Sequence, residues 1–199
     1  MRDKYGVAND PYCWPGTSVL RNKLDIHDEA VLADAEAEFA AVALEHIEIE
    51  APPFDLDYLR HLHEQLFCDV YEWAGEIRSI DLSKGTTRFC TSHRIAPEAD
   101  KVMRALGRVD LLQTPRNTAI GHIAECFGEL NVVHPFREGN GRTLRLFFEH
   151  FLVLHGYAVD WRKVEHHGWI SACIAAVECN YAPLEAIFEG CIDTLPEDR

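Results

Sequence analysis

The chain has 199 residues, of which 47% are hydrophobic and 26% charged, so it has enough apolar side chains for the core of one globular domain. Its 33 acidic and 19 basic side chains give a formal net charge of −14, which disfavours direct binding to the phosphate backbone of a nucleic acid. The same charge repels a free nucleotide, so any nucleotide site must lie at a local cluster of basic side chains.

The first half of the chain predicts two helices and a hairpin. An amphipathic helix is expected from residue 28 to about residue 49, ended by Pro52-Pro53, on apolar residues at near-helical spacing: Val31, Leu32, Ala35, Phe39, Val42 and Ile47. A second helix should begin after Asp55, its N-cap, and end near Tyr71. Residues 77–91 alternate in polarity around Lys84-Gly85, which is typical of a β-hairpin.

The second half predicts helices only. Pro97 opens one to about residue 112, and Pro115 opens another to about Val133. Residues 142–155 are apolar almost all round, which indicates a central buried helix with Gly156 as its C′ residue. Two more helices are expected at about 164–178 and 183–194. The sequence therefore predicts an all-α bundle with one hairpin, in a single domain spanning 1–199 with its core at about 54–194 and an amino-terminal extension with the long helix at about 1–50.

The cysteines and the amino terminus bear on the compartment. Seven cysteines are scattered along the chain without a Cys-x-x-Cys pair, which favours reduced thiols and a cytoplasmic protein. The sequence begins without the apolar stretch of a signal peptide, and no run approaches the roughly 18 apolar residues of a membrane-spanning helix. We therefore expect no insertion into a membrane.

The stretch HPFREGNGR at residues 134–142 lies between two predicted buried helices. The amino terminus of a helix attracts anions, because its first N–H groups are unpaired and the helix dipole is positive there. Gly139 and Gly141 let the backbone approach a phosphate. Arg142 and Arg145 lie three residues apart on one helix face and can both bind phosphate oxygens. This stretch therefore supplies the local basic cluster that a nucleotide site requires.

Two more side chains suit the same chemistry. The Glu138 carboxylate can hold Mg²⁺, which takes one or two protein oxygens and fills its other positions with phosphate and water. His134 is a candidate general base, because its unperturbed pKa lies near working pH. Taken singly, each feature has a structural explanation: a tight turn, a helix cap at Glu138 or Asn140, or an ion pair of Arg145 with Glu149. Their combination at one helix start favours a site for a nucleoside triphosphate with magnesium.

Residues 134–145 also resemble, at every position, the signature HPFx[D/E]GNGRxxR of the Fic family. The segment YEWAGEIR at 71–78, with the hairpin DLSKGTTRF after it, is similar to the Trp-Ala-Gly segment and target-docking flap of that family. The stretch YCWPGTSVLRNKLDI at 12–26 resembles the opening of stand-alone bacterial Fic toxins. The resemblance covers almost the whole chain and implies the Fic-fold helical bundle with one β-hairpin flap.

The resemblance implies a protein adenylyltransferase, which moves AMP from ATP to a hydroxyl of a target protein. In that family His134 would deprotonate the hydroxyl and Glu138 would hold Mg²⁺. The nucleotide would be bound by Gly139, Asn140, Gly141, Arg142 and Arg145. Lys84 and Thr87 in the flap are candidates for contact with the target, and Asn180 is a candidate for contact with the adenine. Two alternatives stay open: transfer of another nucleotide-derived group, such as phosphocholine or UMP, and a silent nucleotide-binding scaffold, against which the intact His134 and Glu138 argue.

The sequence also bears on partners and other ligands. Many Fic enzymes are inhibited by a helix with the motif [S/T]xxxE[G/N], but no Ser or Thr of this chain has Glu four residues later. We therefore expect a small helical antitoxin to supply that glutamate in trans to Arg145. By resemblance, the targets include the ATPase subunits of DNA gyrase and topoisomerase IV. Zinc is not expected, because His61 and His63 point to different helix faces and the remaining histidines form no ligand set.

Overall fold

The computed structural model describes residues 5, 10–50 and 53–195 of the chain. The helices of this part are α1 (Glu29–Leu44), α2 (Leu56–Phe67), α3 (Ile95–Leu106), α4 (Arg116–Val133), α5 (Asn140–Leu154), α6 (His166–Ala176) and α7 (Ala182–Cys191). Two short antiparallel sheets accompany them, β1 (Ser83–Lys84) with β2 (Thr87–Arg88) and β3 (Tyr157–Val159) with β4 (Ile192–Thr194), and two 3₁₀ turns, η1 (Ser92–Arg94) and η2 (Trp161–Lys163). None of the helices described is both long and apolar enough to cross a bilayer. The predicted bundle with a hairpin at 77–91 is confirmed.

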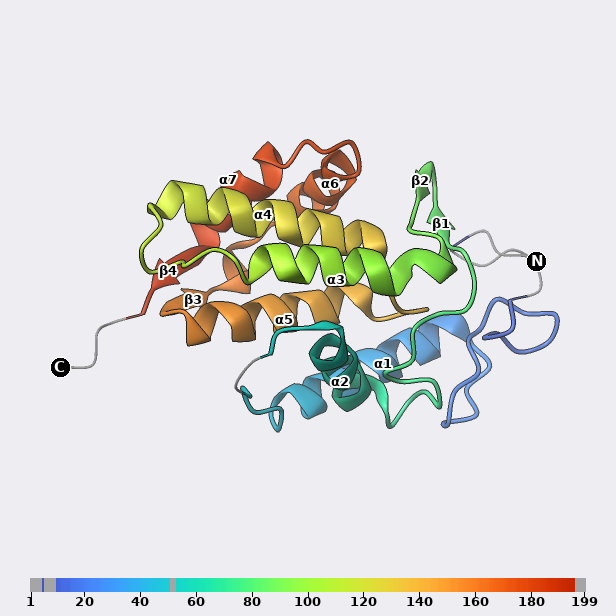
Figure 1. Ribbon diagram of the computed structural model, residues 1–199. Helices are drawn as coiled ribbons and strands as arrows, with labels where there is room; N and C mark the ends of the chain where they lie inside the picture. The colour runs from blue at the N-terminus through green and yellow to red at the C-terminus, as the bar shows by residue number, and fades with distance from the viewer. Residues whose placement is uncertain (1–4, 6–9, 51–52, 196–199) are drawn as a thin grey trace.

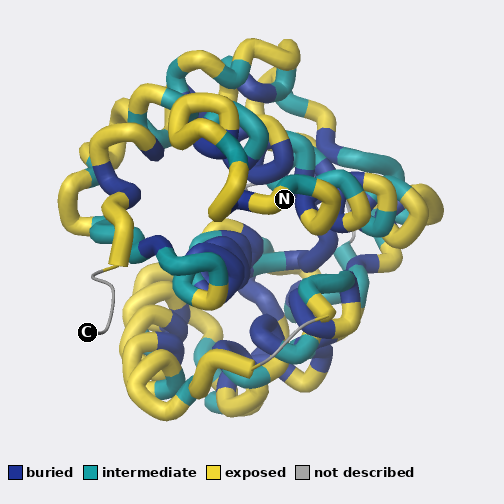
Figure 2. Tube along the Cα trace, turned by 60° about the vertical axis from the view of Figure 1, so that its left-hand side comes forward, coloured by how far each residue is buried: buried dark blue, intermediate teal, exposed yellow. Residues whose placement is uncertain are grey.

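Helix α5 runs through the middle of the bundle, with α4 on one side and α2 on the other (Figure 1). Because it has neighbours on both sides, its aromatic residues Phe147, Phe148 and Phe151 are all buried. Figure 2 shows the same arrangement as buried stretches at the centre and exposed ones at the periphery. The prediction of a central buried helix is confirmed, although the helix begins at Asn140, two residues earlier than expected.

The predicted N-cap at Asp55 and the predicted C′ glycine at Gly156 are present, and Asp28, expected as the first residue of a helix, is the N-cap of α1. The Asp28 carboxylate accepts hydrogen bonds from the N–H groups of the first turn of α1, and Asp55 accepts one from Tyr58 N at the start of α2. Gly156 follows α5 with a φ of 82°, as a C′ glycine does. The largest core cluster includes buried residues from Cys13 to Ile192, so the amino-terminal extension shares its core with the helices.

Helix α1 differs from the prediction in its length and in its buried face. It ends at Leu44 rather than near residue 49, because the chain turns sharply after it: the N–H groups of residues 46 and 47 both bond to Ala43 O. Val31 and Val42 are 53% and 58% exposed, and the buried face contains Leu32, Ala40 and the carboxylate of Glu36. The Glu36 side chain is buried because it pairs with Arg142 and Tyr71. The spacing of apolar residues does not predict such a polar contact.

Other boundaries also moved. Helix α2 ends at Phe67 rather than near Tyr71, α3 covers 95–106 rather than 97–112, and α6 is shorter than predicted at both ends. The sheet of β3 and β4 was not predicted. Residues 192–194, expected as the last turn of a helix, pair instead with the strand that follows Gly156. Two isolated three-residue strands carry too little period-2 pattern to be separated from a helix end.

Candidate active site

The loop that carries the candidate site joins α4 to α5, and His134 begins it. His134 is the C-cap residue of α4 and has left-handed backbone angles, φ 48° and ψ 63°, which are uncommon for a residue other than glycine. The surrounding structure holds this conformation: His134 N donates to Leu130 O at 3.1 Å, and His134 O accepts from Arg78 Nε at 2.7 Å. A strained backbone held by specific partners is a common feature of functional sites.

The His134 ring is held in the form that a general base requires. Its Nδ1 lies 3.2 Å from Asn131 O, and because a carbonyl only accepts, Nδ1 carries the proton and Nε2 presents a lone pair. Phe89 stacks on the imidazole with the ring centroids 3.8 Å apart. Burial lowers the pKa of His134 to about 3, so the ring is neutral at physiological pH.

The two glycines of the loop have different environments. Gly139 has a φ of 78°, and a Cβ there would lie 2.4 Å from the Phe67 ring, so only glycine fits. A Cβ on Gly141 would meet no protein atom within 4 Å. The helix geometry also leaves the N–H groups of residues 140–142 without intrahelical partners. The start of α5 therefore faces open space with backbone donors, as an anion cradle requires.

Asn140 shapes this loop through its side chain. It is buried, its Oδ1 accepts from Phe136 N at 2.8 Å, and its Nδ2 donates to Phe136 O at the same distance. Both ends of the side-chain amide are thus used to close the turn between residues 136 and 140. Contact of the Asn140 side chain with a nucleotide stays a prediction.

The two arginines of the motif have different neighbours. Arg142 pairs with Glu36, and its guanidinium lies 4.8 Å from the centre of the Phe67 ring. Arg145 faces a separate small cavity lined also by Trp161, Val164, His166 and Trp169. Among the described residues, no carboxylate forms an ion pair with Arg145. The sequence left open an ion pair of Arg145 with Glu149, but the Glu149 carboxylate accepts a hydrogen bond from Trp161 Nε1 at 2.9 Å. Burial and the positive charge of Arg142 lower the pKa of Arg145, so a bound anion would be favourable there.

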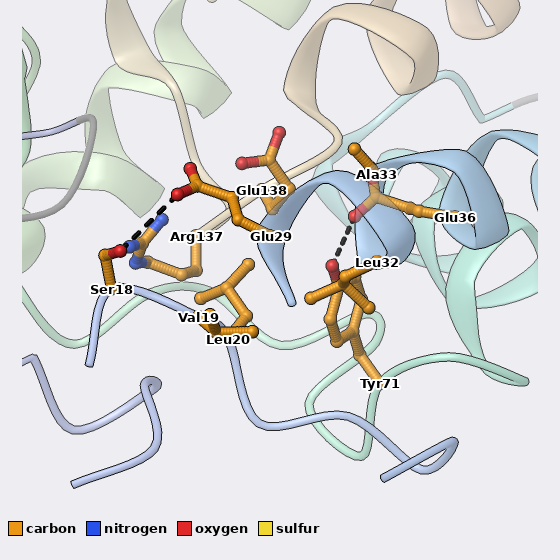
Figure 3. A pocket seen from close by; sticks show the side chains of 10 residues that line it. All are labelled: Ser18, Val19, Leu20, Glu29, Leu32, Ala33, Glu36, Tyr71, Arg137 and Glu138. Atoms are coloured by element: carbon orange, nitrogen blue, oxygen red, sulfur yellow. Dashed lines mark hydrogen bonds between the residues drawn. The ribbon is translucent and has the colours of Figure 1, made fainter. Parts of the chain in front are cut away.

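Glu138 lines a cavity of about 90 Å³ on the α1 side of the loop. Figure 3 shows Glu138 and Arg137 there, opposite Glu36 of α1, with Tyr71 bonded to Glu36. Glu138 Oε1 accepts from Gly139 N at 3.1 Å. Among the residues with described positions, no group of three His, Cys, Asp or Glu side chains is arranged to bind a metal ion. The Glu138 carboxylate beside an anion cradle fits Mg²⁺, which needs one or two protein oxygens and takes its other ligands from phosphate and water.

A second cavity, of about 390 Å³, lies between the hairpin and α6, with His134 in its wall. The hairpin contributes Lys84 and Thr87, so the structure brings both predicted flap residues to the same cavity as the candidate base. Asn180 is exposed and does not line this cavity. The facing wall comes from one side of α6: Trp169, Ile170, Cys173, Ile174 and Val177. The sequence analysis predicted this helix but did not assign these residues to the site, although their spacing of three and four residues indicates one helix face.

Two buried polar residues that sequence reasoning missed hold the loop in place. His63 Nδ1 accepts from Gly75 N at 2.8 Å, so its Nε2 carries the proton and donates to Glu138 O at 3.0 Å. Burial lowers the pKa of His63 to about 4, which keeps this arrangement at neutral pH. Arg78 donates to the carbonyls of His134 and Cys90 and thereby connects the loop to the hairpin.

A buried ion pair joins the loop to the amino-terminal extension. Arg137 Nε and its terminal nitrogen both lie 2.7 Å from Asp10 Oδ2, and both side chains are almost fully buried. Replacing Asp10 with asparagine should lower the free energy of unfolding by about 3 kcal/mol, because it removes the negative half of a buried ion pair. Urea denaturation measures the change. Asp193→Asn removes the exposed pair with Lys163 and should cost at most about 1 kcal/mol; equal effects would contradict the prediction.

A neutral histidine lies at the end of α4, next to the glycine-containing amino terminus of α5. This arrangement is typical of a class of proteins that act on ligands with phosphate groups. The comparison with known families agrees with this. The Fic/DOC family model matches residues 53–152, which include α2, the hairpin, the loop and most of α5. The chain belongs to the Fic/DOC family.

Full-length relatives support this assignment. The chain is 35% identical over 198 residues to a protein from Salmonella typhimurium named probable protein adenylyltransferase Fic, covering 99% of each. Its fold is similar to the crystal structure of BepC from Bartonella tribocorum with bound AMPPNP, with a TM-score of 0.84 and 26% identity over 93% of this chain and 97% of that one. It is equally similar, with a TM-score of 0.84, to a Fic domain from Bartonella quintana with bound ADP, at 28% identity over 92% and 95% of the two chains.

Proposed function

We propose that the protein is an adenylyltransferase that transfers AMP from ATP to a hydroxyl side chain of a target protein. The observation that carries the proposal is the neutral His134 ring, whose Nε2 is unprotonated: His134 lines the cavity between the hairpin and α6 and begins the loop that leads to the anion cradle of α5. The name of the Salmonella relative and the nucleotides in the two Bartonella structures support the same reaction.

In the proposed reaction, His134 Nε2 takes the proton of the target hydroxyl, whose oxygen attacks the α-phosphorus while pyrophosphate leaves. The N–H groups of residues 140–142 and the guanidinium of Arg145 hold the phosphates and stabilise their charge. Glu138 would hold Mg²⁺, which when bound neutralises phosphate charge and polarises the phosphoryl oxygens. Lys84 and Thr87 line the same cavity as His134, and in the proposed reaction the hairpin would add a strand to an extended segment of the target.

Labelling experiments test the proposal. The purified protein is incubated with Mg²⁺, a bacterial lysate and ATP labelled at either the α- or the γ-phosphate. We expect protein labelling from α-labelled ATP only, because pyrophosphate carries the γ-phosphate away. Parallel incubations replace ATP with labelled UTP or a labelled choline nucleotide. Labelling only from one of these would favour the alternative transferase chemistry, and labelling from none of the nucleotides would favour a nucleotide-binding scaffold.

Regulation by a separate protein is the second part of the proposal. Within the described chain no carboxylate pairs with Arg145, so this guanidinium remains accessible to the glutamate of a small helical antitoxin. We propose that such a partner restrains the enzyme in the cytoplasm and that gyrase and topoisomerase IV subunits are among its targets. Affinity purification from the native host tests this: recovery of no small partner, together with harmless expression of the isolated enzyme, would contradict it.

The buried environment of His134 predicts an unusual pH profile. A general base works in its neutral form, which persists above the pKa, and burial has moved that pKa from 6.5 to about 3. The acid limb of kcat/KM should therefore lie well below pH 6.5, with less than a twofold change between pH 7.5 and 5.5, where an unperturbed histidine would lose about tenfold. Initial rates across this range, with melting curves at each pH to confirm folding, measure it. A tenfold loss by pH 5.5 would contradict the prediction.

A further inference from the structure

The ion pair between Glu36 and Arg142 lies beside the anion cradle of α5. Arg142 is the third residue of α5, so its own N–H group belongs to the cradle. Its guanidinium pairs with Glu36 Oε1, and among the described residues Glu36 is the carboxylate that forms an ion pair with it. The side chain of Arg142 is 27% exposed and that of Glu36 only 9%, so the arginine is the more accessible end of the pair.

Glu36 is fixed by contacts that do not involve the arginine. It lies on the buried face of α1, and its second carboxylate oxygen accepts a hydrogen bond from the Tyr71 hydroxyl (Figure 3). Burial, together with the charge of Glu36, raises the pKa of Tyr71, so this hydroxyl keeps its proton and donates it. The Tyr71 ring stacks on Trp73 with the ring centroids 4.3 Å apart. The carboxylate is therefore a fixed point to which the guanidinium of Arg142 is attached.

Phe67 restricts the same guanidinium from another side. The guanidinium carbon of Arg142 lies 4.8 Å from the centre of the Phe67 ring, which is also the ring that a Cβ on Gly139 would meet. The hydrogen bond to Glu36 uses Nη2, whereas a guanidinium has further N–H donors in the same plane. These donors suit phosphate oxygens. An arginine that is already held can bind a phosphate without first losing its rotamer freedom.

We propose that Glu36 is a positioning residue for the nucleotide: through the ion pair, it holds the Arg142 guanidinium beside the phosphates at the start of α5. The proposal deepens the proposed function and rests on the placement of the phosphates given there. Glu36 lines the same small cavity as Glu138, so one carboxylate would orient an arginine while the other holds the metal ion. The opposite role, in which Glu36 only cancels the charge of Arg142, predicts tighter nucleotide binding when Glu36 is removed.

Titration of the purified full chain with Mg²⁺ and α,β-methylene-ATP tests the proposal, because this analogue cannot transfer its AMP. Glu36→Ala should raise the Kd about tenfold, which corresponds to about 1.4 kcal/mol and to the cost of ordering one long side chain on binding. The affinity for adenosine, which has no phosphate, should not change, whereas a general disturbance of the site would weaken both. Glu38→Ala is the matched control, because Glu38 is exposed on the same helix and lines a different cavity.

A double-mutant cycle shows whether Glu36 acts through Arg142. Arg142→Ala should weaken binding of the analogue, and adding Glu36→Ala to that variant should change the Kd by less than about twofold. Losses that add in the double variant would overturn the inference. Glu36→Gln keeps the volume and can still accept from Arg142, so it serves if the alanine variant does not fold, and it should weaken binding about threefold. Melting curves confirm that each variant is folded.

The outcomes separate this inference from the proposed function. If Arg142→Ala weakens binding of the analogue but the folded Glu36 variants bind it as well as the wild type or more tightly, this inference alone is overturned. If Arg142→Ala binds the analogue like the wild type, the guanidinium does not contact the phosphates and the inference is overturned with that contact. The expected losses in binding, together with no labelling of any protein from ATP, would overturn the proposed transfer and leave this inference standing.

Discussion

His134→Ala should lower kcat for adenylylation about 10²- to 10⁴-fold, the usual contribution of a general base. His134 lines the cavity between the hairpin and α6, and Asn131 O fixes the tautomer of its imidazole, so that Nε2 is the unprotonated nitrogen. The ring also stacks on Phe89, so truncation leaves a cavity beside the hairpin and should cost some stability. Single-turnover labelling with α-labelled ATP, at saturating nucleotide, separates the chemical step from this loss.

His122, in the helix that precedes His134, provides the matched control. His122 lies in α4 and bonds through Nε2 to Ala105 O at 3.0 Å, and it does not line the cavity that contains His134. His122→Ala should leave kcat within about twofold of the wild type. If His134→Ala retained more than a tenth of wild-type kcat while folded, another group would have to be the base.

Gly139→Ala and Gly141→Ala should damage the enzyme in different ways. At Gly139 a methyl group meets the Phe67 ring at 2.4 Å on a backbone with φ 78°, so the loop must shift. We expect a loss of roughly 2–4 kcal/mol in the free energy of unfolding, from overpacking and the left-handed backbone. Activity should fall with stability, because the loop positions His134 and Glu138.

At Gly141 the new methyl group meets no protein atom within 4 Å. Since alanine is the better helix former by up to about 1 kcal/mol, the variant should be at least as stable as the wild type. The methyl group would nevertheless fill the space in which a phosphate approaches the backbone, and a clash of about 1.4 kcal/mol weakens binding tenfold. Thermal melting and titration with ATP measure the two effects. Unchanged ATP affinity in Gly141→Ala would show that the phosphates lie elsewhere.

The sequence was most informative where the relevant residues are neighbours in the chain. The cap at Asp55 was predicted because a cap acts within three residues. The candidate site was predicted for the same reason, since its candidate base, carboxylate, glycines and arginines lie within residues 134–145. The partners of those residues were not found, because a hydrogen bond to a distant carbonyl leaves no local pattern.

His63 illustrates the limit. Its spacing from His61 places the two side chains on different helix faces, which argued against a shared zinc ion. The same reasoning gave His63 no role, although it bridges Gly75 and Glu138. Glu36 shows the converse case: an acidic residue that an amphipathic pattern assigns to solvent is buried, because Arg142 lies opposite it.

The contacts that hold the loop at residues 134–142 in place connect parts of the chain that are far apart in sequence, which affects when the enzyme becomes active during folding. They join residues that are 127 positions apart at Asp10 and Arg137, 106 at Glu36 and Arg142, and 75 at His63 and Glu138. Contacts of such long sequence separation form late, because the entropy of closing the intervening chain must be overcome first. A growing polypeptide therefore has no working loop until the chain has been synthesised as far as Arg142 and that region has packed against the amino-terminal part, so activity can begin only after these distant parts of the chain have met.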